Sequence, residues 1–397
     1  MWLFTRRDRP RCPLRTNLAA QGRTRGSAPA LSFLAATLLP LLISVTICAQ
    51  PVSRGNPSPT DKQIAARTEA QLQKALRAAP QSFAANHNLG EFYIQQGRLA
   101  AAIPYLEKAQ QADPKHYANS YDLALAYVLT GDATKARAQI QRALQLSNTA
   151  ELHALLGEVE EKAGDVAAAA AAYHQAAEIE PSEKHLLSLG NLLVKSSNYV
   201  EAIKFFDYGL QKFPRSSQLK VGLGIALYSQ GQYDLAVRTL CEAADLDPSD
   251  HRPYLFLGEM YGVSVEMADE VIRRMAQFVE IHPENALAHY YYALNLWKGR
   301  WGAGREPDLA TVEQLFKRAL SLDPGFAQAR FQLGSLYADQ RKFTEAIEQL
   351  RQAVKLDPAM ANAHYRLGRA YQQTGQHALA AQELDIFQRL KEQHDNR

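Results

Sequence analysis

The sequence has few cysteines and no pattern that would hold a metal ion. Three cysteines occur in 397 residues, and two of them, Cys12 and Cys48, lie near the amino terminus. Only Cys241 remains in the rest of the chain, which excludes an internal disulfide there. No histidine or cysteine pair has metal-ligand spacing. We therefore expect neither a metal nor a cofactor, and we interpret Cys241 as a small buried apolar residue.

The chain also lacks a large net charge of either sign. The chain has 44 Lys and Arg against 41 Asp and Glu, a formal net charge of +3. Seven of the arginines lie within residues 1–49, where Asp8 is the only acidic residue. The rest of the chain is therefore mildly acidic, which argues against a basic surface that follows a phosphate backbone. We expect no nucleic-acid partner.

Residues 1–49 have the pattern of a segment that directs export. Their arginines precede an apolar run over 31–48, and a polar, proline-rich linker follows at 50–60. A basic start, an apolar run and a small residue, here Ala49, are typical of a secretory signal peptide. The same run is close to the shortest that can cross a bilayer, so a retained membrane anchor is the alternative. The first case predicts a periplasmic or extracellular protein, and the second predicts a tether to the inner membrane.

The sequence does contain one unit copied about nine times. A glycine or alanine preceded by an apolar residue returns at steps of 33 to 35 residues, with one step of 41. The series is Gly90, Ala124, Gly157, Gly190, Gly224, Gly258, Ala293, Gly334 and Gly368. A proline follows about 24 residues after most of these positions, and Asn148 replaces it once. Periods in this range indicate a solenoid.

Residues 83–116 show how one unit is expected to fold. Small and apolar residues recur at helical spacings of three and four, first in Leu89, Gly90 and Tyr93 and then in Ala102, Leu106 and Ala109. Gly97 and Pro114 end the two helices, because glycine accepts a left-handed conformation and proline cannot continue a helix. A glycine inside a helix costs about 1 kcal/mol relative to alanine. Gly90 therefore predicts a close crossing of the two helices.

This set of positions resembles the tetratricopeptide repeat, a helix-turn-helix unit of about 34 residues. The resemblance covers roughly residues 61–394. It implies an all-α, right-handed superhelical solenoid of helical hairpins, with a concave groove lined by the first helix of each hairpin. In the family, such a groove usually binds a peptide or a partner protein.

Departures from the repeat define the domain organisation. Residues 61–80 predict a single N-terminal capping helix, and residues 83–394 predict an array of about nine repeats. The repeat at 251–285 is one residue too long and lacks the usual small residues. The repeat at 286–326 carries an inter-helix insertion within 298–308. Insertions in solenoids map to loops on one face, often the binding face.

The resemblance implies that the second, fifth, ninth and twelfth positions of each first helix face the groove. Exposed apolar patches commonly mark binding sites. The predicted partner-binding residues are His87, Glu91, Tyr121, Asn191, Tyr228, Tyr290, Trp297, Phe331, Tyr365 and Arg369. Among them Tyr290 and Trp297 are the preferred candidates. The alternative is that a tightly wound superhelix packs some of these side chains against adjacent repeats.

Some members of the family bind a C-terminal carboxylate with two asparagines and several basic residues. Asn191 with Lys184 and Lys195 provides part of such a set. Glu158 occupies the place of the second asparagine in the preceding repeat. The sequence therefore disfavours this carboxylate clamp.

The repeat pattern accounts for the residues that resemble catalytic motifs. Gly222-Leu-Gly224 lies within a predicted helix with no strand before it, and Gly302-Ala-Gly304 lacks the Lys-Ser/Thr ending of a phosphate-binding loop. We expect no catalytic residues and interpret the chain as a non-enzymatic scaffold, in a bacterial-type cell envelope, that binds a peptide or protein. The alternative is an accessory subunit of an envelope polysaccharide or secretion machinery that contacts glycan through groove aromatics.

Overall fold

The computed structural model describes residues 59–299 and 307–395, and every regular element within these residues is a helix. The predicted all-α fold is thereby confirmed. The leader at 1–49, residues 50–58 of the linker predicted at 50–60, and the middle of the insertion, residues 300–306, lie outside the described residues. The last two residues of the predicted linker belong to the first described helix.

The described helices form one leading helix followed by nine antiparallel hairpins. The leading helix is α2 (Pro59–Ala78). The first five hairpins are α3 (Phe83–Gln95) with α4 (Leu99–Ala112), α5 (Tyr117–Thr130) with α6 (Ala133–Leu146), α7 (Ala150–Ala163) with α8 (Val166–Ile179), α9 (Glu183–Lys195) with α10 (Tyr199–Lys212), and α11 (Ser217–Ser229) with α12 (Tyr233–Leu246). The last four are α13 (Arg252–Glu259) with α14 (Ala268–Ile281), α15 (Ala286–Lys298) with α16 (Leu309–Leu322), α17 (Ala327–Asp339) with α18 (Phe343–Leu356), and α19 (Ala361–Gln373) with α20 (His377–Asp395).

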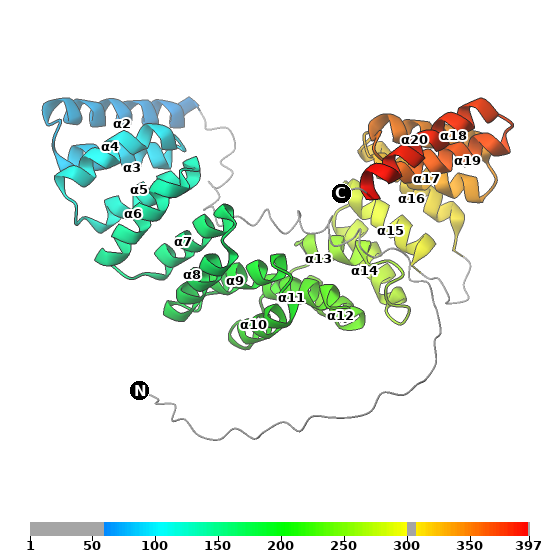
Figure 1. The fold of residues 1–397 in the computed structure, drawn as a ribbon, viewed down its shortest axis with the longest axis horizontal. Helices are drawn as coiled ribbons and strands as arrows, with labels where there is room; N and C mark the ends of the chain where they lie inside the picture. The colour runs from blue at the N-terminus through cyan, green and yellow to red at the C-terminus, as the bar shows by residue number, and fades with distance from the viewer. Residues whose placement is uncertain (1–58, 300–306, 396–397) are drawn as a thin grey trace, which may run out of the picture.

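The hairpins stack side by side into an open arc. Figure 1 shows α2 at one end, α20 at the other, and the hairpins from α7 to α14 across the middle. Each helix contacts its partner in the hairpin, and each hairpin contacts the next one along the chain. An array of this kind is quasi-one-dimensional, because each unit covers the apolar flank of its neighbours. The molecule is a right-handed superhelical solenoid.

The crossing inside each regular hairpin is as close as the sequence predicts. A Cβ atom at Gly90 would lie 2.6 Å from the side chain of Leu106, and one at Gly224 would lie 2.7 Å from Leu240. Carbon atoms pack at about 3.5 to 4.0 Å, so neither position has room for a larger side chain. Ala102 on the facing helix is fully buried. Small residues therefore fix the distance between the two helices.

The first hairpin is covered by α2. Leu72 and Leu76 pack against the core that α3 and α4 share with the next hairpin. Glu69 accepts hydrogen bonds from the Tyr93 hydroxyl at 2.9 Å and from Arg98 at 2.9 Å. The helix thus removes from water an apolar flank that has no preceding repeat to cover it.

The middle of the array departs from the regular hairpin. Helix α13 has eight residues, and the turn from Met260 to Met267 replaces the last part of a normal first helix. Tyr254 stacks on Phe278 at 4.9 Å between ring centroids, and both are fully buried. Large aromatic rings here fill the space between the two helices, whereas in the regular hairpins small residues let the helices approach closely. The core therefore continues through the irregular unit.

None of the helices in the described part of the chain has the length and apolar composition needed to cross a membrane.

Candidate binding groove

The first helices of the hairpins lie on the inner side of the arc. Neighbouring first helices touch one another in most pairs, as α3 with α5, α5 with α7 and α11 with α13. Among the second helices, only α12 and α14 make comparable contact. Elements on the inside of a curve lie closer together than those on the outside, so the first helices line the concave face, here called the groove.

Nine of the ten predicted partner-binding residues keep exposed surface on the first helices. Glu91, Tyr365 and Arg369 are exposed. Half-buried positions are His87, Tyr121, Asn191, Tyr228, Trp297 and Phe331. Their spread over α3 to α19 means that the groove is lined along its whole length and has no single deep centre.

Tyr290 corrects the prediction that its ring lines the groove. It is only 8% exposed, and its ring centroid lies 4.8 Å from Phe326 and 6.0 Å from Phe316. Both phenylalanines come from the segment after the insertion and cover the face that the repeat register assigns to the groove. Burial raises the pKa of the Tyr290 hydroxyl well above its ordinary value. Tyr290 is a core residue.

The N-terminal end of the groove combines imidazoles with carboxylates. Phe83 lies 4.4 Å from the ring of His116 and 5.2 Å from the ring of His87. Asp122, half-buried on α5, was not among the predicted residues. Burial raises its carboxyl pKa to about 6; Glu91 adds to the shift, and His87 and His116 oppose it. This end presents a partly desolvated negative charge.

In the middle of the groove, charged side chains of this protein pair with one another. Lys195 donates to Glu161 at 2.5 Å, and Lys162 donates to Glu158 at 3.0 Å. Glu158 is therefore a counter-ion, and Lys195 is already engaged by a carboxylate of this chain. Both contacts agree with the view that this region is not a carboxylate clamp.

Two tyrosines mark the limit of this middle region. The rings of Tyr228 and Tyr233 lie 5.3 Å apart, at the end of α11 and the start of α12. Burial, together with Tyr233 and Glu259, raises the pKa of Tyr228 to about 12. Glu259 in turn accepts a hydrogen bond from the Tyr291 hydroxyl at 2.5 Å. Glu259 and Tyr291 are thus bonded to each other, and half-buried Tyr228 keeps part of its surface exposed beside them.

The C-terminal end of the groove is aromatic and basic. The ammonium nitrogen of Lys298 lies 4.4 Å from the centroid of the Trp297 ring and donates to Gln332 at 2.7 Å. Burial lowers the pKa of Lys298 to about 8; Arg366 adds to the shift, and Asp339 opposes it. Sequence analysis missed Lys298 because it follows the last position that the repeat register assigns to the groove.

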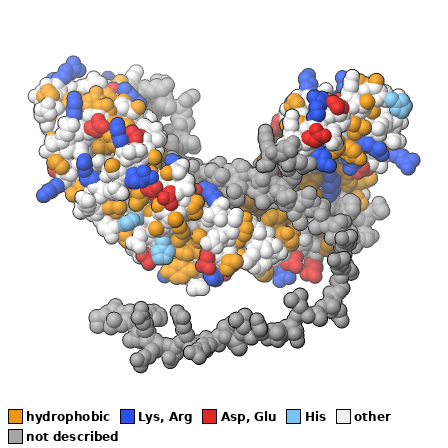
Figure 2. Space-filling model, in the orientation of Figure 1, with side chains coloured by type: hydrophobic (Ala, Val, Ile, Leu, Met, Phe, Trp, Pro, Cys, Tyr) orange, Lys and Arg blue, Asp and Glu red, His pale blue; other side chains and the backbone are white. Residues whose placement is uncertain are grey.

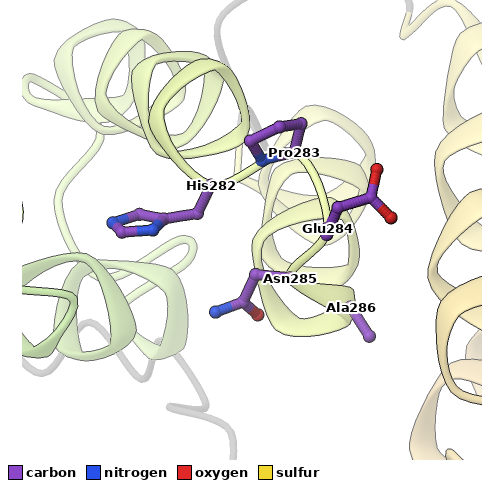
Figure 3. Close-up of a pocket in the computed structure, with 5 residues that line it drawn as sticks. All are labelled: His282, Pro283, Glu284, Asn285 and Ala286. Atoms are coloured by element: carbon purple, nitrogen blue, oxygen red, sulfur yellow. The ribbon is translucent and has the colours of Figure 1, made fainter.

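Two hollows lie away from the groove. Figure 3 shows one at the turn between α14 and α15, with His282 and Glu284 pointing to opposite sides. Glu284 pairs with Arg318 at 2.9 Å, and Asn285 caps α15. The second lies between α8 and α10, beside Phe205, where Figure 2 shows histidine and apolar side chains at the outer edge of the arc. In the second hollow, His174 and Glu178 lie one turn apart on α8 and form an exposed pair at 3.5 Å.

Metal and thiol chemistry find little support in the described residues. Within the described ranges, no group of three or more His, Cys, Asp or Glu side chains could hold a metal ion. Cys241 is 6% exposed, which confirms its interpretation as a buried apolar residue. Burial raises the pKa of its thiol to about 11, so the reactive thiolate is disfavoured.

Comparison with protein families settles what the unit is. A model described as "TPR repeat" matches residues 334–375, and models described as "Tetratricopeptide repeat" match residues 66–117, 93–159, 187–251 and 362–396. The chain is a tetratricopeptide repeat protein. Its nine hairpins over the described residues agree with the predicted number of repeats.

Several known tetratricopeptide repeat proteins resemble this one. The TPR repeat-containing protein YpiA of Bacillus subtilis (strain 168) is 25% identical over 170 residues, 41% of this chain and 37% of YpiA. The chain thus spans less than two thirds of that relative. The C-terminal part of a TPR repeat-containing protein from Cytophaga hutchinsonii aligns with a TM-score of 0.51 at 16% identity, over 61% of this chain and 97% of that one. YrrB, described as a TPR protein with an unusual peptide-binding site, aligns with a TM-score of 0.39 at 18% identity, over 46% of this chain and 95% of YrrB.

Proposed function

We propose that this tetratricopeptide repeat protein is a non-enzymatic scaffold that holds a peptide or a partner protein in its groove. One observation carries the proposal: partly exposed aromatic side chains lie on several of the first helices that line the groove, on α5, α11, α15, α17 and α19. Tyr121, Phe331 and Tyr365 occupy the same position of three different first helices. Rigid aromatic side chains contribute large contact areas at low entropic cost. Aromatic rings spread over several hairpins suit an extended polypeptide better than a compact small molecule.

A glycan-binding role is less well supported by the same residues. It needs a free aromatic face on which a sugar ring can stack. Tyr290 is buried, and the ammonium of Lys298 lies over the ring of Trp297. Tyr365 is 42% exposed, but its ring contacts Phe387 at 5.2 Å. We therefore favour a polypeptide partner.

A matched pair of tyrosines tests whether binding uses the groove. Tyr365 on α19 is 42% exposed inside the arc, and Tyr208 on the second helix α10 is 45% exposed outside it. The full-length protein is immobilised and used to select from a displayed library of random twelve-residue peptides. Enriched peptides are then titrated against the wild type, Tyr365→Ala and Tyr208→Ala. We expect Tyr365→Ala to weaken binding roughly tenfold or more, as truncation of an aromatic hot spot does, and Tyr208→Ala to leave it unchanged. The opposite order of effects would show that the outer surface is the binding site.

We also propose that the scaffold works outside the cytoplasm, either free or tethered by residues 31–48. Support comes from the basic and apolar pattern of residues 1–49. Cell fractionation followed by N-terminal sequencing tests this. A mature chain that begins at Gln50 supports a cleaved signal, and an intact chain in the membrane fraction supports a tether. An intact chain in the soluble cytoplasmic fraction would refute both.

A further inference from the structure

Lys298 is an unusual lysine because it is half-buried at the end of α15. Its ammonium donates to the side-chain oxygen of Gln332 on α17, at 2.7 Å. Among the described residues, no carboxylate lies within ion-pair distance of it, and Asp339 on the same helix as Gln332 pairs instead with Arg366 at 2.7 Å. A neutral amide oxygen stabilises an ammonium less well than a carboxylate does. Within residues 59–299 and 307–395, the buried charge therefore has no carboxylate as its direct counter-ion.

The charges around Lys298 are also positive. Arg366 on α19 is close enough to lower the pKa of Lys298, and Asp339 is the carboxylate that opposes it. Arg369 lies one turn further along α19, exposed, and its guanidinium contacts only the neutral side chain of Gln372 among the contacts described. Residues three apart on a helix share a face. Three basic side chains and one acidic side chain thus lie on the first helices of the last three hairpins.

Aromatic rings border this basic patch. Trp297 precedes Lys298, and Phe331 precedes Gln332 on α17, both half-buried. Tyr365 precedes Arg366 on α19 and is exposed. Each first helix of this end therefore presents an aromatic ring beside a polar or charged group. A partner segment that matches this pattern carries an acidic group next to apolar side chains.

We infer that the groove over α15, α17 and α19 binds a carboxylate of the partner polypeptide, with Lys298 as its ion-pair partner and Arg369 at the open edge. The inference rests on the proposed peptide-binding function and names the chemistry of one contact within it. Gln332 suits a site in which Lys298 changes its partner from this amide to a carboxylate, because the amide has both an acceptor oxygen and two N–H donors. After the ammonium turns to the carboxylate, the amide of Gln332 can donate to the second carboxylate oxygen. The carboxylate belongs either to an Asp or Glu side chain or to the C-terminus of the partner.

The peptides selected on the full-length wild type also test this inference. The selection is repeated on Lys298→Met and on Lys355→Met, which removes an exposed lysine from the second helix α18 of the same end. We expect an acidic residue or a free C-terminus to be enriched at one position on the wild type and on Lys355→Met. Lys298→Met is expected to lose that enrichment. Thermal melts of the three proteins check that each is folded.

Paired peptides then measure the contact directly. The best peptide is compared with its Glu→Gln or Asp→Asn form and with its C-terminal amide, by fluorescence anisotropy. The wild type is expected to prefer the carboxylate form by roughly 10- to 100-fold, the range for a hydrogen bond to a charged group. Lys298→Met is expected to show no preference. The form that loses binding identifies a side chain or the C-terminus as the source.

Two other outcomes overturn the inference, and only one of them also refutes the proposed scaffold function. If peptides bind in the groove but the wild type and Lys298→Met prefer the carboxylate equally, or neither prefers it, the scaffold function stands and the Lys298 contact is refuted. If no peptide is enriched on the folded wild type, the scaffold function in its peptide-binding form fails and the contact fails with it.

Discussion

The two ends of the groove use the same hairpin and carry opposite charge. Around α3 and α5, Asp122 is half-buried near Glu91, and its carboxyl pKa is raised to about 6. Around α15 and α19, Lys298 is half-buried near Arg366, and its pKa is lowered to about 8. Each end therefore holds one charge that burial and a like charge both disfavour. The difference shows that the repeat sets the spacing of the helices, and that residues between its signature positions set the chemistry of the groove.

Core truncations test whether the two ends are stable as separate units. Leu106→Ala in the first hairpin and Phe316→Ala in the seventh each remove a fully buried side chain. We expect losses of about 2 to 5 kcal/mol for the leucine and about 3 to 5 kcal/mol for the phenylalanine. Because each hairpin contacts only its neighbours, amide hydrogen exchange is expected to accelerate mainly at the mutated end. Uniform acceleration over both ends would mean that the array unfolds as one unit and that the ends are not independent.

Overpacking tests whether the scaffold really is the same at the two ends. Ala102 and Ala346 are fully buried at equivalent crossings, opposite Gly90 and Gly334. Ala102→Leu and Ala346→Leu are each expected to destabilise the protein by about 1 to 3 kcal/mol, because neither crossing has room for the added carbons. Urea denaturation gives the two values. A clearly larger effect in one hairpin than in the other would show that the crossings differ.

The sequence predicts this shared scaffold well because it depends on local spacing. The step between glycines and the paired alanines determine where each helix begins, ends and crosses its partner. Tyr290 could not be placed in the same way. Its position in the repeat points to the groove, but Phe316 and Phe326 lie on the far side of an insertion and cover it. The spacing of one repeat does not show how the segment after an insertion packs on the next.

Lys298→Met tests how far the buried positive charge lowers the free energy of unfolding. The folded pKa of about 8 lies below the ordinary value of 10.5, so the folded state binds the proton less tightly than the unfolded state. The cost is complete below pH 8 and disappears as the pH rises toward 10.5. The variant is expected to be more stable than the wild type by about 1 to 3 kcal/mol at pH 7. Arg366 and Asp339, which face Lys298, are the same in both proteins.

Urea titrations of both proteins between pH 7 and about pH 10 measure this difference. The gap is expected to close as the pH rises. A gap that stays constant would mean that Met gains through packing alone, and that the charge of Lys298 is not destabilised.

Asp122→Asn is the counterpart at the acidic end, with a smaller effect. The folded carboxyl pKa of about 6 exceeds the ordinary 3.8, so the charge costs stability above pH 6 and the cost falls as the pH drops toward 4. We expect the variant to be more stable by about 1 to 2 kcal/mol at pH 7, with the gap closing near pH 4. Because His87, His116 and Glu91 face Asp122, the measurement is the difference between variant and wild type at each pH. A difference that does not depend on pH would refute the buried-charge interpretation.

Exposed ion pairs are expected to matter least. Arg98 pairs with Glu69 at the N-terminal end, and Arg366 pairs with Asp339 at the C-terminal end, each with side chains partly open to solvent. Glu69→Gln and Asp339→Asn are each expected to cost less than about 1 kcal/mol, and less still at high salt. Thermal melts at low and high salt check this. A larger loss of stability in either variant would show that its ion pair contributes substantially to the stability of the fold.

The site was less predictable than the scaffold for a physical reason. The repeat register predicts which face of each helix lies toward the groove, and Glu91, Tyr365 and Arg369 on that face are exposed. It does not give the depth of neighbouring side chains, which decides whether a charge is solvated. Asp122 and Lys298 became candidates only when their burial and their neighbours were known.

The short helix α13 has a consequence for the choice of partner. It lies between the acidic and the basic end of the groove (Figure 1) and packs against α15 as well as α14. A small rotation at this hairpin displaces the two tips of the arc far more than it displaces the hairpin itself. The seating of Tyr254 on Phe278 therefore helps to set the distance between the two ends of the groove, and a partner that contacts both ends, as we propose, must match that distance as well as the charges.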